Sequence, residues 1–462
     1  MKQDTLRLFF SKKNNNLNTE EGRNNERLRR MSWTSIAALF AQGLQMLIPL
    51  ITVRITLAYM GEEIYALWTT VNSLFSLMMY ADMGLGNGLQ TKLSQETGRS
   101  KTEFRGKIIV SSTYAVLCVI SFILAVIFAF SFAVVDWPKV VGVQNPDLYS
   151  LTVSIVLAII IPKIISIPLS LVRRCQNAMQ DGYVGYFWQG VSSILSLLSI
   201  YIVIGLDLGP AAVIFISSCI PVVIYVFNSF SYYKKKSEIA PNWRYIETKE
   251  SKAMLKIGIG FFVLSLLNAI SLNMDNYIVA HARTLTEVTP YSIALRATQL
   301  LNVACTVLSA PLWAANGEAL ARGDVAWIKK TTKKMSFLSV LIVFFASIVL
   351  LTAGPYLFDL WVGYDIQINR TLLLGLLLMQ LCFAFISPYF MVLNASGRVK
   401  IQIVVFGILA PMGSAVKFFV CKYFGTIAMN YCAVVLYFCI VLIPIYISVK
   451  KQLRNEGVKN DK

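Results

Sequence analysis

Charged side chains occur inside stretches that are otherwise long and apolar enough to cross a membrane. A charge in such a segment costs about 2.5–3.5 kcal/mol on insertion scales, so each one needs a physical reason to be there. The residues of this kind are Arg54, Lys163, Arg296, Lys417, Asp82 and Asp275. Four basic against two acidic side chains favour an anionic ligand, held through charge-assisted hydrogen bonds.

The depth of each basic residue within its apolar run suggests its role. Lys163, which follows Pro162, and Arg296 lie deep, so we expect them to line a water-filled cavity; structural pairing is the alternative. Arg54 and Lys417 lie nearer the ends of their runs, where a long side chain can reach the interface. We expect Lys417 to do this, and we place Arg54 with the cationic cavity residues.

The two acidic residues have two alternative roles. Asp275 could be a counter-ion to Arg54, or it could couple transport to H⁺ or Na⁺, and Asp82 is a second candidate for coupling. The single histidine, His281, and eight cysteines without a CxxC pair do not form a metal-ligand pattern. We therefore expect no metal, no cofactor and no catalytic residues.

Three glycines follow Asp82 closely, at Gly84, Gly86 and Gly88. A phosphate-cradling loop would need a strand before them and a Lys-Ser or Lys-Thr pair directly after them, and the sequence has neither at these positions. The cluster instead predicts a local helix break or close helix packing.

The elements that must position these residues are membrane-spanning helices. The chain is 56% hydrophobic and only 14% charged, and its uninterrupted apolar runs exclude a barrel, whose strands alternate. We therefore predict an all-α polytopic membrane protein with about twelve transmembrane helices. The expected spans are 32–60, 63–92, 107–134, 148–172, 184–205, 210–233, 253–281, 287–316, 334–353, 370–394, 400–420 and 427–448.

The distribution of Lys and Arg predicts the orientation. With both termini in the cytoplasm, 34 of the 42 Lys and Arg residues fall on the cytoplasmic side. Six spans per half make the halves parallel, and the stretch 291–330 weakly repeats 65–107. The predicted parts are a cytoplasmic tail (1–30), a six-helix lobe (31–233), a basic cytoplasmic linker (234–252), a second six-helix lobe (253–449) and a cytoplasmic tail (450–462).

Three stretches resemble one family of transporters. They are YADMGLGNGLQTKLSQETGRSKTEFRGKI (80–108), YMGEEIYALWTTVNSL (59–74) and NASGRVKIQ (394–402). They resemble bacterial polysaccharide-export, or O-antigen, flippases of the Wzx type, within the multidrug/oligosaccharidyl-lipid/polysaccharide exporter superfamily. Met83 stands where the family pattern often has Leu.

The resemblance implies two six-helix lobes around a central cavity. It implies translocation of an undecaprenyl-pyrophosphate-linked oligosaccharide across the bacterial inner membrane, by alternating access and with ion coupling. The implied partners are this lipid-linked oligosaccharide, H⁺ or Na⁺, membrane lipids, and a polysaccharide polymerase with its chain-length regulator. No motif of the family fixes the cavity residues, so Arg54, Lys163 and Arg296 are chosen by their depth in the membrane.

Two rival functions are a multidrug cation antiporter of the same superfamily and a membrane polysaccharide polymerase or ligase. A cavity for organic cations should be acidic, whereas these intramembrane charges are mostly basic. A polymerase or ligase needs catalytic groups on a sizeable outer loop, and the loops between these spans are short. The net charge of +18 lies between spans, not on one face of a soluble domain, which argues against nucleic-acid binding.

Overall fold

Helices form every regular element in the described part of the chain. The computed structural model describes residues 20–75, 82, 84–97, 105–141, 143, 146–283, 285–362 and 369–460. They divide into two compact units, Met1–Leu93 with Glu103–Ile259, and Ser94–Thr102 with Gly260–Lys462. The prediction of an all-α polytopic membrane protein is confirmed.

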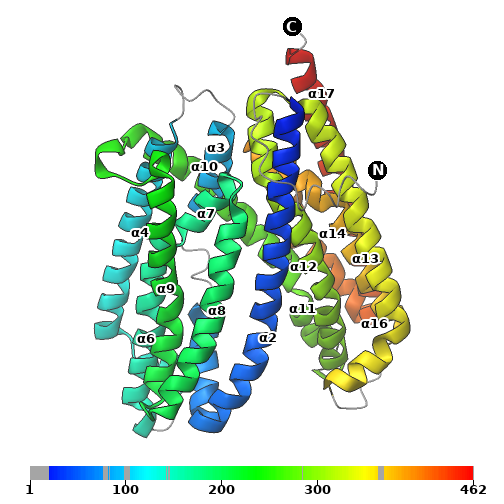
Figure 1. Cartoon of the computed structure of the whole chain (residues 1–462). Helices are drawn as coiled ribbons and strands as arrows, with labels where there is room; N and C mark the ends of the chain where they lie inside the picture. The colour runs from blue at the N-terminus through cyan, green and yellow to red at the C-terminus, as the bar shows by residue number, and fades with distance from the viewer. Residues whose placement is uncertain are drawn as a thin grey trace. The chain divides into compact units, whose positions relative to one another are not determined.

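Unit 1 contains the helices coloured from blue to green in Figure 1. Within it, α2 lies along α8, and α9 packs against both α6 and α8. Its elements are α2 (Glu20–Leu74), α3 (Leu85–Glu96), α4 (Gly106–Val134), α5 (Trp137–Val141), α6 (Tyr149–Leu169), α7 (Leu171–Ala178), α8 (Gly182–Gly205), α9 (Pro210–Lys235) and α10 (Thr248–Asn273). The last residues of α3 and the second half of α10 belong to unit 2.

Unit 2 contains the helices coloured from green to red in Figure 1. Its centre is α14, which packs against both α12 and α13. Its elements are α11 (Asp275–Ala282), α12 (Leu285–Arg322), α13 (Val325–Val362), α14 (Arg370–Ser396), α15 (Lys400–Ile408), α16 (Ser414–Tyr437) and α17 (Ile443–Asn460), with π-helical turns before α16 and before α17.

Glycines with positive φ break two of the long helices. Gly61 (φ 77°) interrupts α2 between the first two expected spans, and Gly425 (φ 87°) interrupts α16 between the last two. These conformations suit glycine because a Cβ would be strained there. Each break turns one continuous apolar stretch into two helical segments.

Eight helical segments of the described residues are long and apolar enough to cross a membrane. They contain nine of the twelve expected spans, because the segment Lys400–Asn455 holds the last two. The first two expected spans lie in α2 and α3, and the seventh is divided between α10 and α11. The number twelve therefore remains a prediction.

The expected basic linker is folded against unit 1. The backbone N–H of Asn242 donates to Ser111 Oγ, and that of Glu247 donates to Ser112 Oγ, both at 3.0 Å. Arg105 also pairs with the Glu247 carboxylate at 2.6 Å. These contacts fasten the linker to the start of α4.

A cluster of ion pairs holds the start of α2 to the α7–α8 turn. Glu26 accepts hydrogen bonds from Arg29 at 2.8 Å and from Arg30 at 2.9 Å, and Arg30 also reaches Asp181 at 3.5 Å. Burial opposes ionisation of Glu26, but the bonds from the two arginines outweigh it and lower the pKa of this carboxyl. The ionised carboxylate therefore stabilises the folded state.

We predict that Glu26→Gln lowers the stability of the detergent-solubilised protein by about 1 kcal/mol at pH 7. Because the folded pKa is depressed, this stabilisation is fully present above the unfolded pKa and is lost as the pH falls below it. Thermal unfolding as a function of pH checks this. The control is Asp136→Asn, which removes an exposed ion pair with Lys139 and should leave the thermal stability nearly unchanged at any pH. If Glu26→Gln lowered the stability equally at neutral and at acid pH, the ion-pair explanation would be wrong.

Candidate functional site

A cationic pocket lies inside unit 1, where two layers of its apolar core meet. Phe75 belongs to one layer, and Leu117 and Ile167 belong to the other. The pocket has a volume of about 300 Å³, the liquid volume of about ten water molecules. Its remaining lining residues are Asp82, Gly86, Lys163, Ser166, Ser170, Leu171, Arg173, Arg174 and Tyr225.

Lys163 enters the pocket from α6. Its Nζ donates to the backbone carbonyl of Phe75 at 3.2 Å, where α2 ends. Pro162 and Pro168 lie in the same helix and lack backbone N–H groups, which loosens the helix on either side of Lys163. One carbonyl satisfies only part of the hydrogen-bonding capacity of an ammonium group, which has three donors.

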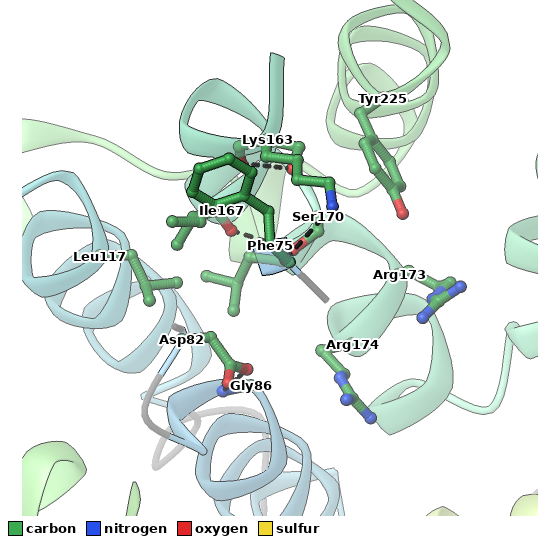
Figure 2. A pocket seen from close by; sticks show the side chains of 12 residues that line it. Phe75, Asp82, Gly86, Leu117, Lys163, Ile167, Ser170, Arg173, Arg174 and Tyr225 are labelled. Carbon is green, nitrogen blue, oxygen red and sulfur yellow. Dashed lines mark hydrogen bonds between the residues drawn. The ribbon is translucent and has the colours of Figure 1, made fainter. Parts of the chain in front are cut away.

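Two arginines and a tyrosine complete the polar wall. Arg173 and Arg174 come from α7, and Tyr225 comes from α9. Figure 2 shows their polar ends around the same opening as the Lys163 ammonium group. Fixed guanidinium donors suit bidentate binding of phosphate oxygens, whereas an ammonium acts as a point charge.

The only acidic group in the described lining is Asp82, and its carboxylate caps α3. Its Oδ1 accepts from the Gly84 N–H at 3.0 Å, and its Oδ2 accepts from the Gly86 N–H at 3.3 Å. Gly84 has a positive φ of 70°, and a Cβ on Gly86 would come within 2.9 Å of Asp82 Oδ2 and 3.1 Å of Arg174 Nε. The glycine cluster therefore forms a helix break, as predicted, and brings Asp82 and Arg174 together.

The arrangement leaves two positive charges in excess. Three basic side chains face one carboxylate, and part of that carboxylate's charge is compensated by the amide groups at the start of α3. In a low-dielectric surrounding, such an excess attracts an anion strongly. A phosphate or pyrophosphate group has the charge and the acceptor oxygens that these donors require.

The sequence predictions found only part of this site. Lys163 and Asp82 were named, whereas Arg173, Arg174 and Tyr225 were missed because the two arginines were assigned to a cytoplasmic loop. A signal was present: Lys163, Ser166, Ser170 and Arg174 are spaced by three or four residues, which puts them on one face of a helix. A polar stripe in an apolar helix indicates a lined cavity.

The other two cationic candidates lie elsewhere. Arg54 belongs to α2, but its side chain is outside the part of the chain that the structure describes. Arg296 belongs to α12 of unit 2, where its side chain is exposed. Arg296 is not among the described residues that line the pocket of Lys163. The role of Arg54 and Arg296 in a common cavity therefore remains a prediction.

A second buried polar cluster lies in unit 2. Lys417, which is only 6% exposed, forms a salt bridge with Asp275. The Tyr291 hydroxyl lies 3.2 Å from Asp275 Oδ2 and 3.1 Å from Asn430 Oδ1, and donates to one of them at a time. The prediction that Lys417 snorkels to the interface is wrong, because Asp275 gives it an internal partner. The partner suggested for Asp275 by the sequence was Arg54.

Comparison with known proteins identifies the family. The profile of the family described as "Polysaccharide biosynthesis protein" matches residues 32–312, more than half of the chain. The chain belongs to this family. A Yersinia pseudotuberculosis relative described as "Putative O-antigen export protein" is 22% identical over 357 residues, covering 76% of this chain and 79% of the relative. These matches confirm the resemblance seen in residues 59–74 and 80–108.

Solved structures of the same fold come from transporters. The Vibrio cholerae MATE transporter VcmN in its bent form has a TM-score of 0.78 at 15% identity, and the match covers 93% of this chain and 98% of that one. A transporter of the MOP superfamily from Pyrococcus furiosus, whose binding pocket is described as having reverse polarity, has a TM-score of 0.78 at 13% identity, with 93% and 96% covered. At such low sequence identities these structural matches show the fold alone.

We predict that Gly86→Ala damages the pocket while Gly43→Ala does not. The new methyl group at position 86 must displace the Asp82 carboxylate or the Arg174 side chain, whereas nothing lies within 4 Å of a Cβ at Gly43. Gly86→Ala should lower polysaccharide output at least about threefold with the protein still in the membrane. Equal output from the two glycine variants would show that the close approach at Gly86 is unimportant.

We predict that Lys417→Ala destabilises the protein by about 3–5 kcal/mol, because it leaves the Asp275 carboxylate buried without its counter-ion. Removing both charges, by Asp275→Asn with Lys417→Met, should cost less than Lys417→Ala alone. Thermal unfolding in detergent measures both. The control is Lys422→Ala, at an exposed position on the same helix. A double variant less stable than Lys417→Ala alone would argue against pairing of Lys417 with Asp275.

Proposed function

We propose that this protein moves an undecaprenyl-pyrophosphate-linked oligosaccharide from the cytoplasmic to the outer leaflet of the bacterial inner membrane. The observation that carries the proposal is the pocket of Lys163, Arg173 and Arg174 inside an apolar helical unit. Membership of the polysaccharide biosynthesis family and the description of the Yersinia relative as an O-antigen export protein support the same cargo.

The physical problem of such transport is the headgroup. A pyrophosphate with attached sugars cannot enter hydrocarbon, while its polyprenyl tail can remain there. The cationic donors of unit 1 replace water around the phosphate oxygens as the headgroup passes. Arg54 and Arg296 supply further contacts to the headgroup, in a cycle that gives alternating access to the two membrane faces.

Ion coupling completes the proposal. In an ion-coupled cycle, binding of H⁺ or Na⁺ drives the return of the empty transporter to its starting conformation. The ion then needs a carboxylate within the membrane as its binding group. Asp275 suits this role better than Asp82, because Asp82 is engaged as the cap of α3. When Asp275 takes up a cation, its salt bridge to Lys417 weakens, and this couples ion binding to the packing of α11 against α16.

The charges argue against an organic cation as cargo, because three basic groups in the pocket would repel it. The termini lie in the cytoplasm in this account, since that orientation puts the basic loops on the inner side. Polymerase and chain-length regulator proteins act next on the translocated unit.

We predict that replacing both Lys163 and Arg174 by Ala lowers surface polysaccharide at least about tenfold, because each charge-assisted bond contributes about 1.5–3 kcal/mol to headgroup binding. The assay is complementation of a strain that lacks its own flippase, with membrane abundance measured in parallel. Lipid-linked oligosaccharide should accumulate in the inner leaflet. Lys139→Ala, at an exposed outer position, is the control; normal output from the double variant would remove the pocket from the transport path.

A further inference from the structure

A second cationic cavity lies in unit 2, apart from any residue used above. It occupies about 710 Å³ between the start of α13, the end of α14 and the first three turns of α17. Its lining residues are Lys329, Thr332, Lys333, Tyr389, Tyr446, Ile447, Val449, Lys450, Lys451, Leu453 and Arg454. The described lining contains five basic side chains and no acidic one.

The basic side chains form two facing pairs on the rim. Lys329 and Lys333 are four residues apart in the first turns of α13, and Lys450 and Arg454 are four residues apart near the end of α17. All four are exposed. Residues with this spacing lie on the same side of a helix, so each helix presents two adjacent cations to the cavity.

The floor of the cavity is aromatic and apolar. The Tyr446 ring lies 5.3 Å from the Tyr389 ring and 6.0 Å from that of Phe385, measured between centroids. The Ser336 hydroxyl fixes this part of α14 by donating to the Phe385 carbonyl at 2.8 Å. Tyr446 precedes Lys450 by one helical turn, which is about 6 Å along the axis of α17.

One polar group on this wall has no partner. Thr332 is 1% exposed and lines the cavity, and its hydroxyl makes no hydrogen bond among the described residues. A buried hydroxyl without a partner costs free energy unless a ligand or water satisfies it. The Thr332 Oγ1 atom is itself covered by the surrounding protein, so the polar ligand contacts on this wall are those of Lys329 and Lys333.

We propose that this cavity is a binding site for an anionic phospholipid of the cytoplasmic leaflet. The cationic rim binds the phosphate, while the acyl chains lie against the tyrosines and Ile447. Basic pockets between helices at the cytoplasmic membrane surface suit anionic headgroups. A free phosphate ion would leave the apolar floor unused, and a zwitterionic lipid would bring an ammonium group toward five cations.

The test measures lipid binding to the purified full-length protein by native mass spectrometry. The wild type should retain phosphatidylglycerol in preference to phosphatidylcholine. Each basic group near the surface contributes about fivefold to binding. The variant Lys329→Gln/Lys333→Gln/Lys450→Gln/Arg454→Gln should therefore bind phosphatidylglycerol at least about 25-fold more weakly, and replacement of the three lysines by arginine should preserve binding.

A matched control removes four exposed basic residues of unit 1: Lys234, Lys235, Arg244 and Lys249. This variant should bind phosphatidylglycerol like the wild type.

Three results would overturn the proposal: equal retention of the two lipids, equal loss in the control variant, or displacement of phosphatidylglycerol by equimolar undecaprenyl pyrophosphate, which would give the cavity to the cargo. Lys163→Ala should leave phosphatidylglycerol binding unchanged, so this test is independent of the proposed transport function.

Discussion

The cost of a charge in a low-dielectric environment determines the arrangement of both polar clusters in this protein. A lone ammonium, guanidinium or carboxylate inside a helical membrane protein must find a partner, a cavity or the interface. Lys417 and Asp275 partner each other in unit 2. In unit 1 the pocket instead contains more basic than acidic side chains, so part of its positive charge is not neutralised by the described lining and can bind an anionic ligand. That imbalance distinguishes a binding site from a structural ion pair.

Breaks in the helices position these charged side chains. Proline residues in α6 and the transition to α7 bring Lys163 and Arg174 to one side of unit 1. The glycine-rich break before α3 turns the Asp82 carboxylate toward the same pocket. Residues that would weaken a continuous helix thus create a lining in which half-buried basic groups from α6 and α7 meet an acidic one.

The helices and part of the pocket could be predicted from the sequence, and the residues that were missed were missed for physical reasons. Apolar run length predicted the helices, because lipid leaves the backbone few alternatives. Depth in the membrane identified Lys163, but depth says nothing about neighbours, so the Lys417–Asp275 pair was missed. Arg173 and Arg174 were counted as loop charges because span boundaries are uncertain by a turn, and one turn decides whether a guanidinium faces a pocket or the cytoplasm.

The most direct measurement of the central claim is a cryo-electron microscopy map of the protein in lipid nanodiscs with undecaprenyl pyrophosphate. The account predicts density for the two phosphates within hydrogen-bonding distance of Lys163 Nζ and the Arg174 guanidinium. A headgroup bound elsewhere, with this pocket filled only by water, would contradict it.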